Sequence, residues 1–246
     1  PQTTAEAEHY FEEAIAADPS FSKAYAALAA VYLMGDFGGV RPTVEFMEKA
    51  KGALAKALAL NDQDAETHVA MAMLAARFDF DWETGERHVR RALEIDPDLA
   101  EAHHQLAQNI LVPQSRLEEA IAEQDRAAKL NPFEVGIAAG GPWMLYLKRD
   151  FEGARRGFSA NSDPALLGGM GLGMVLQAMG RHQEALPIFY RLQKTFPQPY
   201  NLGFIGASRA GMGDVAGVGG EVGGNGGEGG GVGERGSVGG GRVVSR

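Results

Sequence analysis

A proline or an equivalent turn residue closes one amphipathic segment after another along this chain of 246 residues. These turn residues are Pro19, Asp62, Pro97, Pro132, Pro164 and Pro197. The intervals between them are 43, 35, 35, 32 and 33 residues. All but the first are close to the period of about 34 residues that is typical of stacked helix–turn–helix repeats. The spacing therefore predicts a solenoid of similar helix pairs.

Small and apolar residues recur at fixed distances before each turn. Because separations of three and four residues stack on one side of a helix, these positions form a single helical face. The face consists of Ala7, Ala50, Gly85, Ala120 and Ala185, then Phe11, Leu54, Val89, Gln124 and Phe189, then Ala14, Ala57, Ala92, Ala127 and Leu192. We expect it to belong to the second helix of each repeat, where small residues let paired helices approach closely.

The pattern resembles the tetratricopeptide repeat over residues 5–214. The best matches to the second helix are GRHQEALPIFYRL (residues 180–192) and LEEAIAEQDRAAKLNP (residues 117–132). The pair Leu172 and Gly173 stands where the family has Leu-Gly in its first helix. This resemblance implies an all-α, right-handed superhelical solenoid of antiparallel helix pairs, with about five repeats and a partial unit at each end.

A narrower resemblance concerns FDFDWETGERHVRRALEIDPDLAEAHHQLA (residues 78–107). This segment is similar to repeat arrays that follow winged-helix, adenylate cyclase or Ser/Thr kinase domains in bacterial signalling proteins. The first unit, AEAEHYFEEAIAADP, supplies only a second helix, so we expect the chain to be a fragment of a longer protein. A sensory or regulatory module of such a signalling protein, without its effector domain, is the alternative function.

Two repeats depart from the pattern. The first carries about nine extra residues, and Gly35, Gly38, Gly39 and Pro42 indicate that these form a loop. In the fourth, Pro142 replaces the usual glycine of the first helix, which predicts a kink or an early helix start. The second helix of that repeat ends weakly, at SANSD (residues 159–163).

The composition changes abruptly after Asp214. Residues 1–214 are expected to form the repeat array, and residues 215–246 a disordered tail, because glycine brings no side chain to bury. The tail is either a genuine glycine linker or an out-of-frame reading of a GC-rich gene. Its removal is expected to leave stability nearly unchanged.

Charge and hydropathy exclude several classes of partner. A net charge of −9 and a pI near 5.2 disfavour nucleic acid, which needs a basic face. The chain has no signal peptide and no apolar run of the 18 to 20 residues that span a bilayer, so we expect a cytoplasmic protein with no membrane partner. The absence of cysteine excludes thiolate chemistry.

No set of residues indicates catalysis, a metal or a cofactor. The GGMGLG run (residues 168–173) lies inside an expected helix, where its glycines would serve close packing. His68 and His103 occupy equivalent positions and are expected to pack between helices. His103 and His104 point about 100° apart and cannot share a metal as an i, i+4 pair does. The chain is therefore interpreted as a non-enzyme.

The family register assigns a mostly apolar concave groove to the first helices. Lys23 and Arg77 are its only basic residues, so a clamp for acidic chaperone tails is not expected. Trp143 is either a binding anchor or a core residue of the irregular fourth repeat. We expect a non-catalytic scaffold that binds a peptide or protein partner through Met73, Arg77, His104, Gln108, Trp143, Tyr146, Met170 and Met174.

Overall fold

A computed structural model describes residues 2–34, 44–160 and 167–214, and these residues form helices and no strand. The expected loop at residues 35–43, the weak helix ending from residue 161 and the glycine-rich tail lie outside the described residues. The helices are α1 (Gln2–Ala17), α2 (Ser22–Met34), α3 (Val44–Leu60), α4 (Ala65–Arg77), α5 (Trp82–Ile95), α6 (Ala100–Gln105), α7 (Leu117–Leu130), α8 (Val135–Leu147), α9 (Phe151–Ala160), α10 (Leu167–Ala178), α11 (His182–Thr195) and α12 (Pro199–Gly211). A π-helical segment, η1 (Leu106–Leu111), continues α6.

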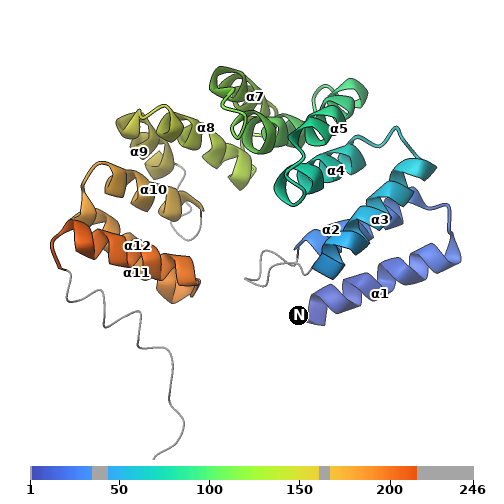
Figure 1. The fold of residues 1–246 in the computed structure, drawn as a ribbon, viewed down its shortest axis with the longest axis horizontal. Helices are drawn as coiled ribbons and strands as arrows, with labels where there is room; N and C mark the ends of the chain where they lie inside the picture. Colours follow the sequence, from blue (N-terminus) through green and yellow to red (C-terminus); the bar gives the residue numbers. More distant parts are fainter. Residues whose placement is uncertain (1, 35–43, 161–166, 215–246) are drawn as a thin grey trace, which may run out of the picture.

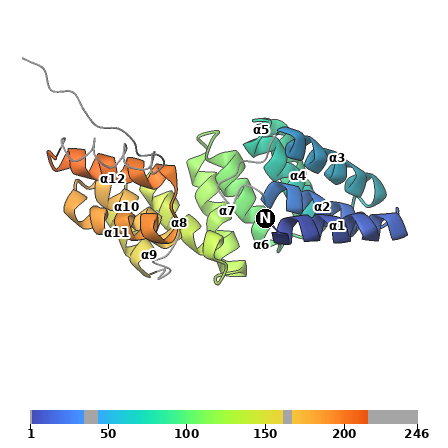
Figure 2. The same cartoon turned by 90° about the horizontal axis from the view of Figure 1, so that it is seen from below.

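The helices stack in pairs along an arch (Figure 1). The pairs are α2 with α3, α4 with α5, α6 and η1 with α7, α8 with α9, and α10 with α11, and each helix packs against its neighbours in the sequence. The helix α1 precedes the first pair and α12 follows the last. First helices such as α4 and α10 lie toward the inside of the arch, and α5 lies outside (Figure 1). Figure 2 shows the pairs following one another along the long axis. The prediction of an all-helical repeat solenoid is confirmed.

The core is distributed between neighbouring pairs, as expected for a solenoid. The face predicted for the second helices is buried in α3, α5, α7 and α11 and half-buried in α1, and in α3 the side chains of Ala50, Leu54 and Ala57 are fully inaccessible. One hydrophobic cluster joins Leu28 and Leu33 of α2 to Leu54 of α3 and Leu74 of α4. The first helix of the following pair, here α4, therefore completes the core of the pair before it.

The first helix of the fourth repeat contains Pro142 and does not begin earlier than the other first helices. The helix α8 begins three residues after Pro132, as α6 begins three residues after Pro97, and it runs through Pro142 to Leu147. The expectation of an early start is therefore wrong. Across the interface, α9 places Gly157 where an added Cβ would lie 2.6 Å from Cγ of Pro142. A glycine on the second helix thus makes room for the proline ring.

The turns that follow the first helix share one backbone feature in five consecutive units, those of α4, η1, α8, α10 and α12. One residue in each of these turns adopts a positive φ angle, as in the left-handed residue that commonly ends a helix. These residues are Phe80 (55°), Ser115 (61°), Arg149 (64°), Gly180 (73°) and Gly213 (83°). Three of these positions carry a side chain, which makes the conformation costly.

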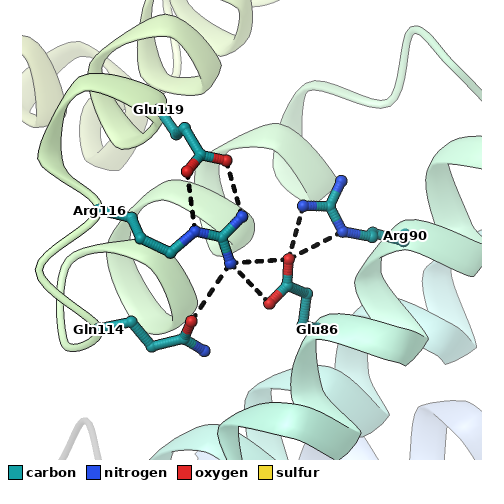
Figure 3. A network of polar contacts seen from close by, with 5 residues as sticks. All are labelled: Glu86, Arg90, Gln114, Arg116 and Glu119. Carbon is teal, nitrogen blue, oxygen red and sulfur yellow. Dashed lines mark hydrogen bonds and ion pairs between the residues drawn. The ribbon is translucent and has the colours of Figure 1, made fainter.

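Ion pairs next to these turns connect each repeat to the one before it. At the centre of Figure 3, Nη1 of Arg116 lies 2.8 Å from Oε2 of Glu86, and the same guanidinium forms two hydrogen bonds to Glu119. Arg90 donates two hydrogen bonds to Oε1 of Glu86, an oxygen that also accepts from Arg116. The equivalent contacts at the other boundaries are Lys51 with Asp79 (2.9 Å), Lys148 with Glu118 (3.1 Å) and Arg181 with Glu152 (3.9 Å).

Candidate partner-binding surface

The eight residues predicted to bind a partner lie on the first helices of four consecutive repeats. Arg77 is exposed and the other seven side chains are half-buried. We call the surface formed by these eight residues the inner surface. It consists of Met73 and Arg77 of α4, His104 of α6, Gln108 of η1, Trp143 and Tyr146 of α8, and Met170 and Met174 of α10.

The α8 part of this surface is aromatic and rests on the core. The indole ring of Trp143 meets the ring of Tyr146 edge-on at 5.5 Å between centroids and that of Phe158 at 5.2 Å. Phe158 is 2% exposed, so one face of Trp143 is fixed by packing. The side chain serves the core of the fourth repeat and remains partly accessible.

The methionines at the two ends of the surface also pack on core clusters. Met170 and Met174 contact the cluster around Phe189 of α11, and Met73 contacts the cluster around Leu54 of α3. Arg77 donates a long hydrogen bond of 3.9 Å from Nη1 to Sδ of Met73. These half-buried methionine side chains are flexible and carry a polarisable sulfur.

The third repeat is different because its part of the surface is polar. Nδ1 of His104 lies 2.9 Å from Oε1 of Gln124, and Nε2 of Gln108 donates to the same oxygen at 3.4 Å. Gln124 belongs to α7 and is 1% exposed. Its Nε2 donates at 2.8 Å to the main-chain carbonyl of Ile137 in α8. A buried amide therefore connects the two predicted residues to the next repeat.

The carbonyl of Ile137 determines how these groups share their protons. A carbonyl can only accept, so the nitrogen of the Gln124 amide must face it and Oε1 must face His104. His104 consequently carries a proton on Nδ1. In the neutral ring, Nε2 is then left as a hydrogen-bond acceptor.

A second row of polar side chains runs beside His104 and Gln108. Nε2 of Gln105 donates to Oε1 of Glu101 at 2.6 Å, and Nδ2 of Asn109 donates to Oε1 of Gln105. All three side chains are half-buried. The repeat register did not indicate Gln105 or Asn109 as part of this surface.

The π-helical segment explains why Asn109 is partly accessible. The residue 35 positions earlier is Leu74, which is 1% exposed and packs on the preceding repeat. In the third repeat it is Ile110 that fills the space beside the preceding second helix, where an added Cβ on Gly85 would lie 2.7 Å from its Cδ1. The wider π turn shifts the later residues around the helix. Ile110 is thereby buried in place of the polar Asn109.

One sequence signal for this site was present. Gln124 stands at the position where the other second helices have Phe11, Leu54, Val89 and Phe189. A single polar residue in an otherwise apolar position indicates a buried hydrogen-bond network, since an unpaired buried amide is costly. The identity of its partners depended on the tertiary structure.

His68 and His103 are buried between helices, as predicted. In each case Nε2 faces a carbonyl of the preceding turn, that of Asp62 at 3.1 Å and that of Pro97 at 3.0 Å. The other nitrogen faces the second helix of the same repeat. His68 meets Nδ1 of His88 at 2.9 Å, whereas His103 meets Oε2 of Glu123 at 2.5 Å.

These two histidine contacts differ electrostatically. Burial lowers the pKa of His88 to about 4, and the charges of His68 and Arg87 act in the same direction. His103 instead has an oxygen at each ring nitrogen, the carbonyl of Pro97 and a carboxylate oxygen of Glu123.

The remaining chemical motifs have structural roles in the described residues. The GGMGLG run lies in α10, where added Cβ atoms on Gly171 and Gly173 would lie 2.4 Å from Phe158 and 2.6 Å from Phe189, respectively. For Gly171 and Gly173 the prediction that these glycines serve close packing is confirmed. Within the described ranges, no three His, Asp or Glu side chains gather as a metal site would require. No described helix is both long and apolar enough to span a membrane.

No protein-family model matches the chain, and no curated protein matches it. Solved structures do. The structure from a functional characterisation of Pseudomonas aeruginosa PilF matches this chain with a TM-score of 0.63 at 19% sequence identity. The match covers 83% of this chain and 91% of that chain. The structure of PilW, a type IV pilus biogenesis factor, matches with a TM-score of 0.67 at 16% sequence identity and covers 80% of this chain and 88% of that chain. The structure of a tetratricopeptide repeat protein from Parabacteroides merdae matches with a TM-score of 0.63 at 15% sequence identity and covers 86% of this chain and 81% of that chain. Together with the repeat period and the stacked helix pairs, these likenesses identify the fold of the chain as a tetratricopeptide repeat solenoid.

Proposed function

We propose that this chain is a non-catalytic protein-interaction scaffold that binds a peptide or protein partner along the inner surface. The observation that carries the proposal is the set of half-buried aromatic and methionine side chains on the first helices α8 and α10. Partly accessible residues of this kind supply much of the energy in protein interfaces. Their stems pack on the core, so little side-chain entropy is left to lose on binding.

The composition of this surface favours an extended or helical peptide with apolar side chains. Met170 and Met174 can adapt to different shapes, while Trp143 offers a larger and more rigid face. A regulatory module of a signalling protein would use the same surface. The gene sequence upstream of Pro1 distinguishes these two settings, because a winged-helix, kinase or cyclase domain there would identify the second.

The test combines partner identification with mutation of the inner surface. A pull-down with the full chain followed by mass spectrometry identifies the partner, and calorimetry measures its affinity. The double variant Trp143→Ala and Met174→Ala is expected to weaken binding by about 2 kcal/mol or more. The control, Asp98→Ala, removes a carboxylate that is 77% exposed and should change affinity little.

Both variants must be compared as folded proteins, because Trp143 also packs on Phe158. Circular dichroism melting provides that check. If the folded double variant binds the partner as tightly as the parent chain, the inner surface is not the binding site. The outer surface of the arch then becomes the place to examine.

A further inference from the structure

The third repeat contributes a cluster of polar side chains to an inner surface that is otherwise mostly apolar. Its five half-buried side chains, Glu101, His104, Gln105, Gln108 and Asn109, define what we call the third-repeat site. At positions 35 residues earlier, α4 has Val69, Ala70 and Met73 in place of His104, Gln105 and Gln108. The preceding repeat therefore shares only the carboxylate, since Glu66 stands 35 residues before Glu101, and lacks the other polar side chains.

The internal hydrogen bonds of the site leave some of its acceptor atoms without a described partner. Glu101 can only accept, so Gln105 must donate to it, and Asn109 must in turn donate to Gln105. The atoms with no described partner are then Oε2 of Glu101 and Oδ1 of Asn109. In the row formed by His104 and Gln108, the acceptor atoms with no described partner are Nε2 of His104 and Oε1 of Gln108.

The charge of the site is negative and is not balanced locally. The side-chain amides each retain one N–H group, but the only carboxylate in the site belongs to Glu101. Among the described residues, no lysine or arginine lies within ion-pair distance of this carboxylate. A ligand group with several donors and a positive charge would satisfy these acceptors best, because charge-assisted hydrogen bonds are the stronger ones.

We propose that the third-repeat site binds a lysine or arginine side chain of the partner. Both groups carry several N–H donors and no acceptor, which complements the four acceptor atoms of the site, one of them a carboxylate oxygen. The proposal rests on the proposed function, since it specifies one contact of a partner on the inner surface. It also reverses the polarity of a clamp for carboxylates, which would present basic residues.

The test uses a phage-displayed library of random 12-residue peptides selected on the folded chain of 246 residues. Enriched peptides are expected to carry a lysine or arginine at a fixed distance from apolar residues. One such peptide is then synthesised with lysine and with norleucine at that position. The affinity of both peptides is measured by fluorescence anisotropy for the parent chain, Glu101→Gln and Glu83→Gln.

Glu101→Gln keeps the size of the side chain and removes its charge. On the parent chain, replacing lysine with norleucine should weaken binding at least about tenfold, as for loss of a charged hydrogen bond. On Glu101→Gln the same replacement should cost about twofold or less, because the two changes remove one interaction. Glu83→Gln changes the net charge equally on an exposed residue of α5 and should behave as the parent does.

The outcomes separate this inference from the proposed function. If the selected peptides depend on Trp143 but show no basic residue, or no coupling between that residue and Glu101, the third-repeat site does not bind a cation. If no peptide is enriched, or if enriched peptides bind independently of Trp143 and Met174, the proposed function fails and this inference fails with it.

Discussion

Pro142 of α8 lies directly against Gly157 of α9, and a Cβ atom at residue 157 would come within 2.6 Å of Cγ and 3.1 Å of Cβ of the proline. In the fifth repeat the first helix has Gly173 at the position 31 residues after Pro142, and an added Cβ there would lie 2.6 Å from Cζ of Phe189. A glycine thus allows a close approach in both repeats, on the second helix in one and on the first helix in the other. Packing depends on the sum of the two side chains at the contact.

Gly157→Ala is therefore expected to destabilise the protein by about 1 kcal/mol. Alanine gains up to about 1 kcal/mol in helix propensity, but overpacking against a rigid proline ring costs about 1 to 3 kcal/mol. The matched control is Gly52→Ala in α3, where nothing lies within 4 Å of an added Cβ. That variant should be stabilised by about 0.5 to 1 kcal/mol. Urea unfolding of both variants decides the point, and equal stabilisation would contradict the packing argument.

A second prediction concerns the stability effect of substitutions at the turn residues with positive φ angles. Gly180 has a φ angle of 73° and no atom within 4 Å of an added Cβ, so Gly180→Ala should cost about 1 kcal/mol through backbone strain alone. Ser115, with φ at 61°, is the reverse case. Ser115→Gly should gain about 0.5 kcal/mol, because relief of strain exceeds the added freedom of the unfolded chain. Opposite shifts in melting temperature are expected, and shifts of the same sign would refute this account.

The histidine pair in the second repeat makes stability dependent on pH. The folded pKa of His88 is about 4, below its ordinary value near 6.5, so between these values the unfolded chain binds more protons. The stabilising contribution is present above pH 6.5 and is lost as the pH falls toward 4. Because His88 is only half-buried, we expect a loss on the order of 1 kcal/mol between pH 7 and 5.

His88→Gln tests this dependence because it removes the titrating ring. Chemical unfolding of the parent chain and of the variant at pH 7, 6 and 5 gives the two slopes. The parent should lose more stability than the variant over this range, where carboxylates with ordinary pKa values remain ionised. Parallel slopes would show that His88 does not contribute.

The ion pairs between repeats should respond to salt. Burial raises the pKa of Glu86, but hydrogen bonds from Arg90 and Arg116 outweigh it and hold the pKa below its usual value. Glu86→Gln is expected to cost about 1 kcal/mol at low salt, and less at 1 M salt, where screening acts within about 3 Å. Glu94→Gln, which disrupts an ion pair with Arg91 inside α5, should cost less than about 0.5 kcal/mol. Denaturation at two salt concentrations separates the cases.

The period and the position of the helices could be predicted because they depend on local information. Turn residues such as Pro97 and Pro132 end helices through their own covalent geometry. The face with Leu54 and Phe189 follows from the helical period alone. The burial of His68 and His103 was predictable for the same reason, since their place in the repeat already placed them between helices.

The contents of the candidate site could be predicted only in part. The register selected His104 and Gln108, but it did not indicate Gln105 or Asn109, because it assumed a regular α-helix. The π-helical segment is a response to packing: Ile110 fits beside Gly85, and the helix widens to bring it there.

The sequence by itself thus determined the repeat, its length and the faces of its helices, because each of these follows from contacts between residues close together in the chain. Only the tertiary structure decided which atom faces which partner. The direction of the hydrogen bonds from Ile137 through Gln124 to His104 depends on residues 13 and 20 positions apart on different helices. Whether a buried histidine meets another histidine, as His68 meets His88, or a carboxylate, as His103 meets Glu123, is likewise decided only once the two helices are packed. Such relations require distances between helices, which no local pattern contains.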